Sequence, residues 1–494
     1  MSGNQMFTRR WFIGGAASLG AFQGCRFLAS PIDIGGTPKL RFGVVTDIHV
    51  IAEHTDRDHC GNTRTFRRAL KWFDRQGVDA VMLAGDMADA GLITQLQSVA
   101  DAWNSVFPNG RSTIDGRKVE KVFVYGNHDW EGCNYNYNIY GWNSKNLVND
   151  QIAKFGLKQT WEEVFEEEYS PIYRKTIKGF NFIGGHWDPK GNGAGWGTGP
   201  DIKDFVAGIK GEIDPSKPFF YVQHPHPYCT CYGKWAWGHD NGISTKVLSD
   251  YSNAIAFSGH SHYSLIDERS IWQGAFTSIG CGSLRYVSTP EDEFPELGYE
   301  NVSCKKPRAD ADKLMPMFPR REQRNGLLVS VYGDHIAIER RDFLRDCRLA
   351  DDWVMPLPVA ESKPFAFAER AKKMAIPQFP KDASVKLERG KTTPRGGKSS
   401  IPTISVTFPT AVQTKDSRVL RYVVTALRKN DTEILSRNVL SPDYHLAVNL
   451  AAKEVTVPVE ISALPAGVEV HFRITPYQWF GKSGKPIESS AIRV

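Results

Sequence analysis

The chain has 494 residues, more than one hydrophobic core usually serves, so its length predicts one large domain and at least one smaller module. Hydrophobic residues make up 41% and charged residues 23% of the sequence, a composition that excludes a largely disordered chain. The formal net charge of +6 is small for this length, so charge gives no indication of nucleic-acid binding.

Residues 1–30 resemble a twin-arginine export signal. Arg9 and Arg10 precede an apolar run at residues 14–22, which is too short to cross a bilayer of about 30 Å as a permanent helix. We therefore expect export by a twin-arginine-type route to the periplasm or the extracellular space, with removal of this segment. Two alternatives stay open, namely a lipid anchor to a membrane through Cys25 and a buried N-terminal helix.

From residue 40 onward, short apolar runs alternate with amphipathic stretches such as residues 65–76, which indicates a layered α/β domain. The expected strands are residues 40–45, 80–83, 122–125, 180–183, 219–222, 254–257 and 275–279, followed by a hairpin of residues 326–331 and 335–339. Several runs end in Gly, Asp or His. Ligands of open α/β sheets bind beyond the carboxyl ends of the strands, so we expect the functional residues there.

The C-terminal part of the chain has a different pattern. Residues 346–400 are rich in Pro, Lys, Ala and Gly and are predicted to be a linker. Residues 401–494 show short strands without helices between them, which predicts a small all-β sandwich. Within it, residues 464–474 resemble the penultimate strand of a fibronectin type III domain, although Val470 stands where that family often has a tyrosine.

Five short motifs occur in order along the chain, each directly after an apolar strand. They are Asp47-Ile48-His49, Gly85-Asp86-Met87-Ala88-Asp89, Gly126-Asn127-His128-Asp129, His224-Pro225-His226 and Gly259-His260-Ser261-His262. Each motif alone is weak, because such short patterns are more often capped turns or surface pairs. The ordered set, with every member after a strand, indicates one shared site.

The residue types fit a pair of metal ions. Two ions a few ångströms apart need carboxylate and imidazole ligands, with one oxyanion between them to offset their repulsion. Asp47 and His49 are two residues apart, so an extended backbone puts both on one side. A glycine precedes Asp86, Asn127 and His260 and lets the backbone turn sharply there. The neutral amide of Asn127 adds no further charge.

Together the motifs closely resemble the signature of the calcineurin-like metallophosphoesterase family, and the resemblance covers residues 40–340. It implies a four-layer α-β-β-α sandwich of two mixed sheets, here a catalytic domain at residues 38–345. By this resemblance Asp47, His49 and His262 hold one ion, Asn127, His224 and His260 hold the other, and Asp86 bridges them.

The resemblance also implies hydrolysis of phosphomonoesters or phosphodiesters by attack of a metal-bound hydroxide on phosphorus. His128 is expected to protonate the leaving group, with Asp89 as its orienting carboxylate. His226 is interpreted as either a neighbour of the ligands or an exposed side chain. Asp129 is expected to support the turn after His128.

The sequence alone leaves the metal, the substrate and the class of reaction open. The ligands suit two divalent or trivalent ions, and iron, manganese and zinc all fit. The phosphate ester could belong to a nucleotide, a sugar or a lipid, and the oligomeric state is open. One alternative uses the same ions for a hydrolysis without phosphate. Another is a non-catalytic extracytoplasmic binding protein that uses its C-terminal sandwich, although the complete ligand set argues against it.

Overall fold

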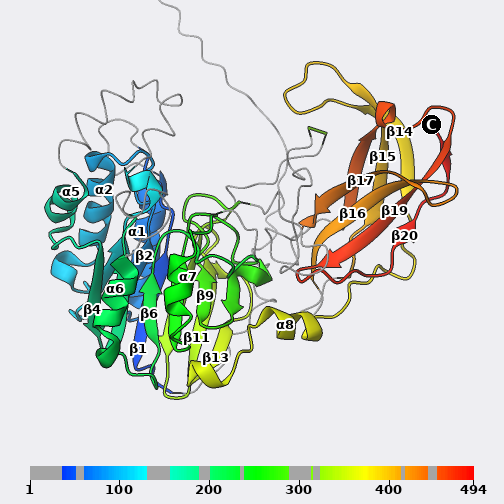
Figure 1. Cartoon of the computed structure of the whole chain (residues 1–494). Helices are drawn as coiled ribbons and strands as arrows, with labels where there is room; N and C mark the ends of the chain where they lie inside the picture. The colour runs from blue at the N-terminus through cyan, green and yellow to red at the C-terminus, as the bar shows by residue number, and fades with distance from the viewer. Residues whose placement is uncertain are drawn as a thin grey trace, which may run out of the picture.

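The computed structural model describes residues 36–51, 61–130, 156–187, 201–233, 238–288, 313–314, 323–412, 418–442 and 453–494. Within these ranges an α/β domain is followed by all-β sheets (Figure 1). The predicted export signal and Cys25 lie outside them. No helix in the described ranges combines the length and the apolar character that crossing a membrane requires.

The first sheet of the α/β domain is mixed. Its strands are β1 (Leu40–Val45), β2 (Ala80–Ala84), β3 (Glu120–Val124), β10 (Asn325–Val331), β11 (His335–Asp342), β12 (Cys347–Arg348) and β13 (Trp353–Pro356). In the described part of the chain their order is β12-β11-β10-β1-β2-β3, with β13 also paired to β11. β1 runs parallel to β2 and antiparallel to β10.

The second sheet is also mixed. Its strands are β4 (Ile172–Ile177), β5 (Phe180–Gly185), β6 (Phe219–Val222), β7 (Ala254–Ser258), β8 (Ile271–Gln273) and β9 (Thr277–Gly280). The order is β4-β5-β6-β7-β9-β8 over the described residues. The central strands β5, β6, β7 and β9 run parallel, so their carboxyl ends lie along the same side of the sheet.

The two sheets pack face to face through an apolar core. The ring of Phe42 on β1 meets the rings of Phe182, Phe220 and Phe257 of the second sheet, at centroid distances of 5.1, 4.8 and 5.8 Å. All four side chains are fully buried. Each such aromatic pair contributes about 0.5–1.5 kcal/mol beyond the burial of its area. This packing fixes the strand ends of one sheet relative to those of the other.

Helices cover the outer faces of both sheets (Figure 1). They are α1 (Gly61–Arg75), α2 (Ile93–Asn104) and α5 (Gly156–Phe165) on the first sheet, and α6 (Asp201–Gly208) and α7 (Ile243–Leu248) on the second. Helix α1 shows why. Its buried residues Phe66, Ala69, Leu70 and Phe73 have the spacing of one helix face. The predicted four-layer α-β-β-α sandwich is confirmed.

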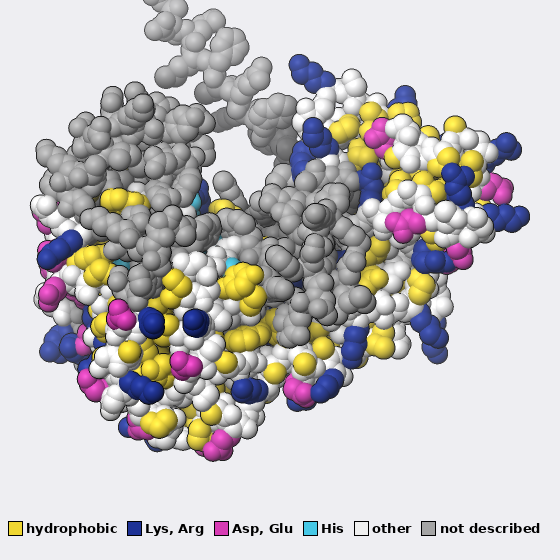
Figure 2. All heavy atoms as spheres, in the orientation of Figure 1, with side chains coloured by type: hydrophobic (Ala, Val, Ile, Leu, Met, Phe, Trp, Pro, Cys, Tyr) yellow, Lys and Arg dark blue, Asp and Glu magenta, His cyan; other side chains and the backbone are white. Residues whose placement is uncertain are grey.

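The C-terminal sheets form the predicted all-β sandwich. Their strands are β14 (Lys386–Thr392), β15 (Ile401–Pro409), β16 (Val419–Arg428), β17 (Glu433–Leu440), β18 (Glu454–Glu460), β19 (Glu469–Gln478), β20 (Ile487–Glu488) and β21 (Ile492–Arg493). One sheet has the order β14-β15-β18 and the other β17-β16-β19-β20. Ile404, Val406 and Phe408 alternate along β15 into a shared apolar core. Lys and Arg side chains project from the outer surface (Figure 2).

Residues 346–400, predicted as a linker, contain regular structure of their own. β12 and β13 extend the first sheet of the α/β domain, and β14 belongs to the sandwich. Between them lies helix α8 (Phe367–Lys373). The apolar side chain of Phe367 is buried in a cluster with Trp479 and Phe480 of the sandwich. This segment therefore packs against both parts of the chain.

Glu268 joins the sandwich to the α/β domain. Its carboxylate contacts three guanidinium groups, those of Arg340 on β11, Arg370 on α8 and Arg418 just before β16. The distances to Arg340 and Arg418 are 3.5 and 3.2 Å. Burial alone would raise the pKa of Glu268, but the three arginines outweigh it and lower that pKa from 4.5 to about 2. Glu268 is therefore ionised in the folded protein.

We expect Glu268→Gln to destabilise the protein at pH 7 by about 3 kcal/mol, because three arginines would lose their shared carboxylate. Since the pKa of Glu268 is lowered on folding, its contribution is present above pH 4.5 and is lost as pH falls towards about 2. Urea unfolding followed by fluorescence should show a stability gap between wild type and variant that narrows from pH 7 to pH 3. A constant gap, or none, would contradict this.

The matched control is Glu369→Gln, which removes a solvent-exposed carboxylate on α8 that pairs with Lys372. Exposed ion pairs contribute little, so this variant should unfold as the wild type does at both pH values.

Candidate metal centre

Four buried side chains from three motifs meet at the carboxyl ends of the strands. Ligand atoms of Asp47, His49, Asp86 and His262 all lie within 4.8 Å of one another. His262 Nε2 is 2.9 Å from Asp47 Oδ1, and His49 Nε2 is 3.4 Å from Asp86 Oδ2. The structure therefore brings together the three residues predicted to hold one ion and the residue predicted to bridge.

A second group shares Asp86. His224 Nε2 lies 3.1 Å from Asp86 Oδ2 and 3.2 Å from His260 Nδ1. Asn127 precedes His128, whose backbone N–H donates to Asp86 Oδ1 at 2.9 Å. The Oδ1 atom of Asn127 is buried and has no hydrogen-bond partner within the described residues. Asp86 thus stands between the two groups, as a bridging ligand must.

Five of the seven proposed ligand residues lie in a strained backbone conformation. Positive φ angles occur at Asp47 (53°), His49 (46°), Asp86 (53°), His260 (70°) and His262 (58°). Non-glycine residues rarely adopt this region, at a cost of about 1–3 kcal/mol each. Strain of this kind persists only where the surrounding structure enforces it, and it clusters at functional sites.

Two glycines allow the close approach of the motifs. A Cβ on Gly126 would lie 2.2 Å from Asp86 Oδ1, and a Cβ on Gly259 would lie 2.4 Å from Asp47 Oδ2. Real Cβ atoms do not come this near to another atom, so any larger residue would displace a carboxylate. Sterics therefore require the glycines that precede Asn127 and His260.

The hydrogen bonds of the imidazoles leave lone pairs pointing at one another. His49 Nδ1 donates to the Asp89 carboxylate at 3.1 Å, and His262 Nδ1 donates to the backbone carbonyl of Tyr286 at 3.3 Å. A histidine binds metal through an unprotonated nitrogen, which with Nδ1 engaged is Nε2 in both rings, and these two atoms are only 3.1 Å apart. Two facing lone pairs repel unless a cation lies between them. The arrangement fits a metal ion.

The electrostatics of the site also favour bound positive charge. Burial would lower the pKa of His49, but Asp47, Asp89 and Asp86 outweigh it and raise this pKa to about 9. Burial is likewise outweighed at His224, where Asp86 and Asp47 raise the pKa to about 9. The carboxylates thus create a buried potential that attracts cations, which is what a metal site needs.

His128 and Asp89 lie beside the first group, with the His128 ring 4.5 Å from the His49 ring. His128 Nδ1 donates to the backbone carbonyl of Asp89 at 2.8 Å. The Asp89 carboxylate, expected to orient His128, instead accepts from His49 Nδ1 and contacts Arg285. Asp89 therefore orients two histidines, one through its carbonyl and one through its carboxylate.

The structure also decides between the two interpretations of His226, a neighbour of the metal ligands or an exposed side chain. Its Nδ1 and Nε2 lie 2.7 Å from the hydroxyls of Ser258 and Ser261, so both ring nitrogens are occupied by hydrogen bonds. His226 is buried and braces the loop that carries the last motif. Asp129 accepts the backbone N–H of Gly126 at 2.7 Å, which supports the turn as expected.

Sequence reasoning missed one charged residue at the site, Arg285. It lies in the loop after β9, outside every motif, and its guanidinium contacts the Asp89 carboxylate. The available signal was its position five residues after a strand whose carboxyl end lies at the same edge as the motifs. Tyr286, the next residue, packs its ring 4.4 Å from that of His262.

The five motifs and this geometry agree with a match between residues 40–264 and the model of the calcineurin-like phosphoesterase family. This region is a calcineurin-like metallophosphoesterase domain. The family match and the buried Asp and His groups together indicate a dinuclear metal site. The family also implies phosphate-ester substrates.

Two solved phosphatase structures match part of this chain at low sequence identity. A dimetal phosphatase from Danio rerio matches at 11% identity and a TM-score of 0.36, over 65% of this chain and 99% of that one. A purple acid phosphatase, PPD1, from yellow lupin seeds matches at 13% identity and a TM-score of 0.40, over 64% of this chain and 53% of that one. No curated protein matches the sequence significantly.

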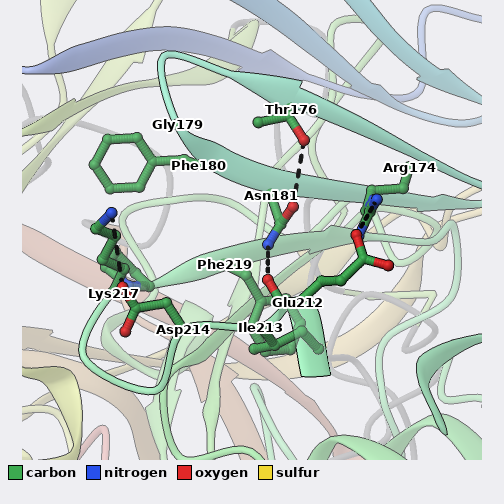
Figure 3. Close-up of a pocket in the computed structure, with 11 residues that line it drawn as sticks. Arg174, Thr176, Gly179, Phe180, Asn181, Glu212, Ile213, Asp214, Lys217 and Phe219 are labelled. Carbon is green, nitrogen blue, oxygen red and sulfur yellow. Dashed lines mark hydrogen bonds and ion pairs between the residues drawn. The ribbon is translucent and has the colours of Figure 1, made fainter. Parts of the chain in front are cut away.

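A surface pocket lies at the opposite end of the second sheet of the phosphoesterase domain, where β5 and β6 begin (Figure 3). Its walls carry the ion pairs Arg174–Glu212 (2.6 Å) and Lys217–Asp214 (3.6 Å). Each of these cations already has a partner of opposite charge. None of the residues that line this pocket belongs to the five motifs or to the buried Asp and His groups of the metal centre.

Proposed function

We propose that this chain is an exported dimetal phosphoesterase that hydrolyses phosphomonoesters or phosphodiesters. The observation that carries the proposal is the pair of buried Asp and His groups that share Asp86, within a domain of the matching family. Shared carboxylates of this kind suit two ions a few ångströms apart. The fibronectin type III-like character of the C-terminal sandwich stays a prediction.

The chain's own residues divide into metal-holding and proton-transferring groups. The proposed ligands are Asp47, His49 and His262 for one ion, Asn127, His224 and His260 for the other, and Asp86 for both. Bound ions of iron, manganese or zinc would supply charge that neutralises phosphoryl oxygens and lowers the pKa of water.

His128 is the proposed general acid. Its Nδ1–H is held by the Asp89 carbonyl, so proton transfer to the leaving alkoxide is directed to Nε2. Burial lowers the pKa of His128 from its usual 6.5 even though Asp86 lies nearby. A lowered pKa makes the imidazolium a stronger acid but reduces the fraction of His128 that carries the proton at neutral pH.

We expect the purified, metal-loaded protein to hydrolyse a chromogenic phosphomonoester or diester and to lose this activity with a chelator. His128→Ala should lower kcat by about 10²–10⁴-fold because the general acid is removed, while metal content stays unchanged. Steady-state kinetics and elemental analysis of the same samples measure both.

The control is His335→Ala, which removes a histidine on β11 that pairs with the exposed carboxylate of Asp334. It should retain full activity. If the metal-loaded wild type hydrolyses neither ester, the enzyme proposal is wrong and the binding-protein alternative gains support. Equal activity of His128→Ala and wild type would remove His128 from the mechanism.

We also propose export through the N-terminal twin-arginine-type segment. Joint replacement of Arg9 and Arg10 by lysine keeps the charge but removes the guanidinium pair. In a host with this pathway, cell fractionation should then find the variant retained in the cytoplasm. Arg26→Lys is the matched control and should be exported normally. Unchanged export of the double variant would contradict the proposal, and Cys25→Ser reports on lipid anchoring.

A further inference from the structure

Arg285 is held in place by the first metal-binding motif. The backbone N–H of Leu284 donates to the Thr46 carbonyl at 3.0 Å, and Ser283 Oγ donates to the Asp47 carbonyl at 3.3 Å. The same Ser283 Oγ accepts the backbone N–H of Arg285 at 3.0 Å. The loop after β9 is therefore tied to the chain on both sides of a proposed metal ligand, and Arg285 is positioned by these bonds.

The Arg285 side chain lies at the edge of the metal centre and is partly exposed to solvent. It contacts the Asp89 carboxylate, whose side chain is 1% exposed, while the Arg285 side chain is 22% exposed. Among the described residues, its other contact is with the ring of Tyr286, at 5.7 Å. A guanidinium has five N–H donors, so the contact with Asp89 leaves donors available. Through Asp89 the guanidinium lies beside His49, a proposed metal ligand, and His128, the proposed general acid, which both bond the same Asp89 residue.

The charge of the substrate decides what such a cation can do. A phosphomonoester has three non-bridging oxygens and close to two negative charges at neutral pH. A diester has two non-bridging oxygens and one charge. Two metal ions and Arg285 together offer three positive partners, which suits the monoester. The planar fork of arginine also matches two oxygens of a phosphoryl group at once.

We propose that Arg285 binds a phosphoryl oxygen of the substrate and makes the site selective for phosphomonoesters over diesters. This inference rests on the proposed function, because it names the substrate class of the same site. The alternative role for Arg285 is to balance the buried charge of Asp89 and so to position His49. That role predicts weaker metal binding and an equal loss for both ester classes.

The experiment compares wild type, Arg285→Met and Arg285→Lys on para-nitrophenyl phosphate and bis-para-nitrophenyl phosphate. For the monoester, Arg285→Met should lower kcat/KM by roughly tenfold to hundredfold, the loss expected for a charged hydrogen bond. For the diester, kcat/KM should change less, so the ratio of the two values falls. Lysine keeps the charge but not the fork, so Arg285→Lys should recover part of that ratio.

Binding of inorganic phosphate to the metal-loaded proteins, measured by calorimetry, gives a readout that does not depend on turnover. It should weaken by roughly tenfold or more in Arg285→Met while the metal content stays that of wild type. Arg345→Met is the matched control, because Arg345 is 28% exposed and pairs with the buried carboxylate of Asp342 at 3.0 Å. It should leave the ester ratio and phosphate binding unchanged.

An unchanged ester ratio with unchanged phosphate affinity in Arg285→Met would overturn the inference while leaving the proposed function intact. Equal losses on both esters together with lost metal would overturn it in favour of the Asp89-positioning role. If the metal-loaded wild type hydrolyses neither ester, the proposed function fails. Phosphate binding then tests the role of Arg285 by itself. Equal affinity of Arg285→Met and wild type for phosphate would exclude a contact between Arg285 and the phosphoryl group.

Discussion

Two buried carboxylates, those of Asp47 and Asp86, impose the constraint on which the site depends. Both lie at the carboxyl ends of central parallel strands and are essentially inaccessible to water. Removing an ionised carboxylate from water costs several kcal/mol unless positive charge compensates it. The imidazoles of His49 and His224 face these carboxylates and have their pKa raised to about 9. The carboxylates therefore favour positive charge beside them, which protons on the imidazoles or bound metal ions can supply.

The fold contributes rigidity to this strained arrangement. Left-handed backbone conformations at five of the ligand residues cost free energy that the two sheets must offset. They do so through a core in which Phe42 packs against three rings of the opposite sheet. The docked sandwich also contributes, since Glu268 lies six residues after His262 and is held by Arg418. The metal ligand His262 and the contact with the C-terminal sandwich at Glu268 thus lie on one short segment of the chain.

Much of the fold was predictable because the buried strands are continuous apolar runs. Residues 40–45 and 219–222 were predicted as strands and form β1 and β6 with the same bounds. β4 was missed because Ile172 and Ile177 enclose four mostly polar residues at a sheet edge. β14 was missed for the same reason, since its side chains are largely exposed and show no apolar period.

The grouping of the motif residues was predictable from their strand-end positions, but the directions of their side chains were not. Asp89 follows Asp86 by three residues, and only the folded backbone shows that its carbonyl reaches His128 while its carboxylate reaches His49. His226 could not be assigned because its partners, Ser258 and Ser261, come from a distant segment.

The central claim is that Asp86 is shared by two metal ions, and metal stoichiometry tests it most directly. Elemental analysis of the protein loaded with iron, manganese or zinc should find about two ions per folded wild-type chain. Asp86→Asn should lose binding at both positions, because the shared ligand contributes to each. A folded wild type that takes up no metal, or an Asp86→Asn variant that keeps both ions, would contradict the account.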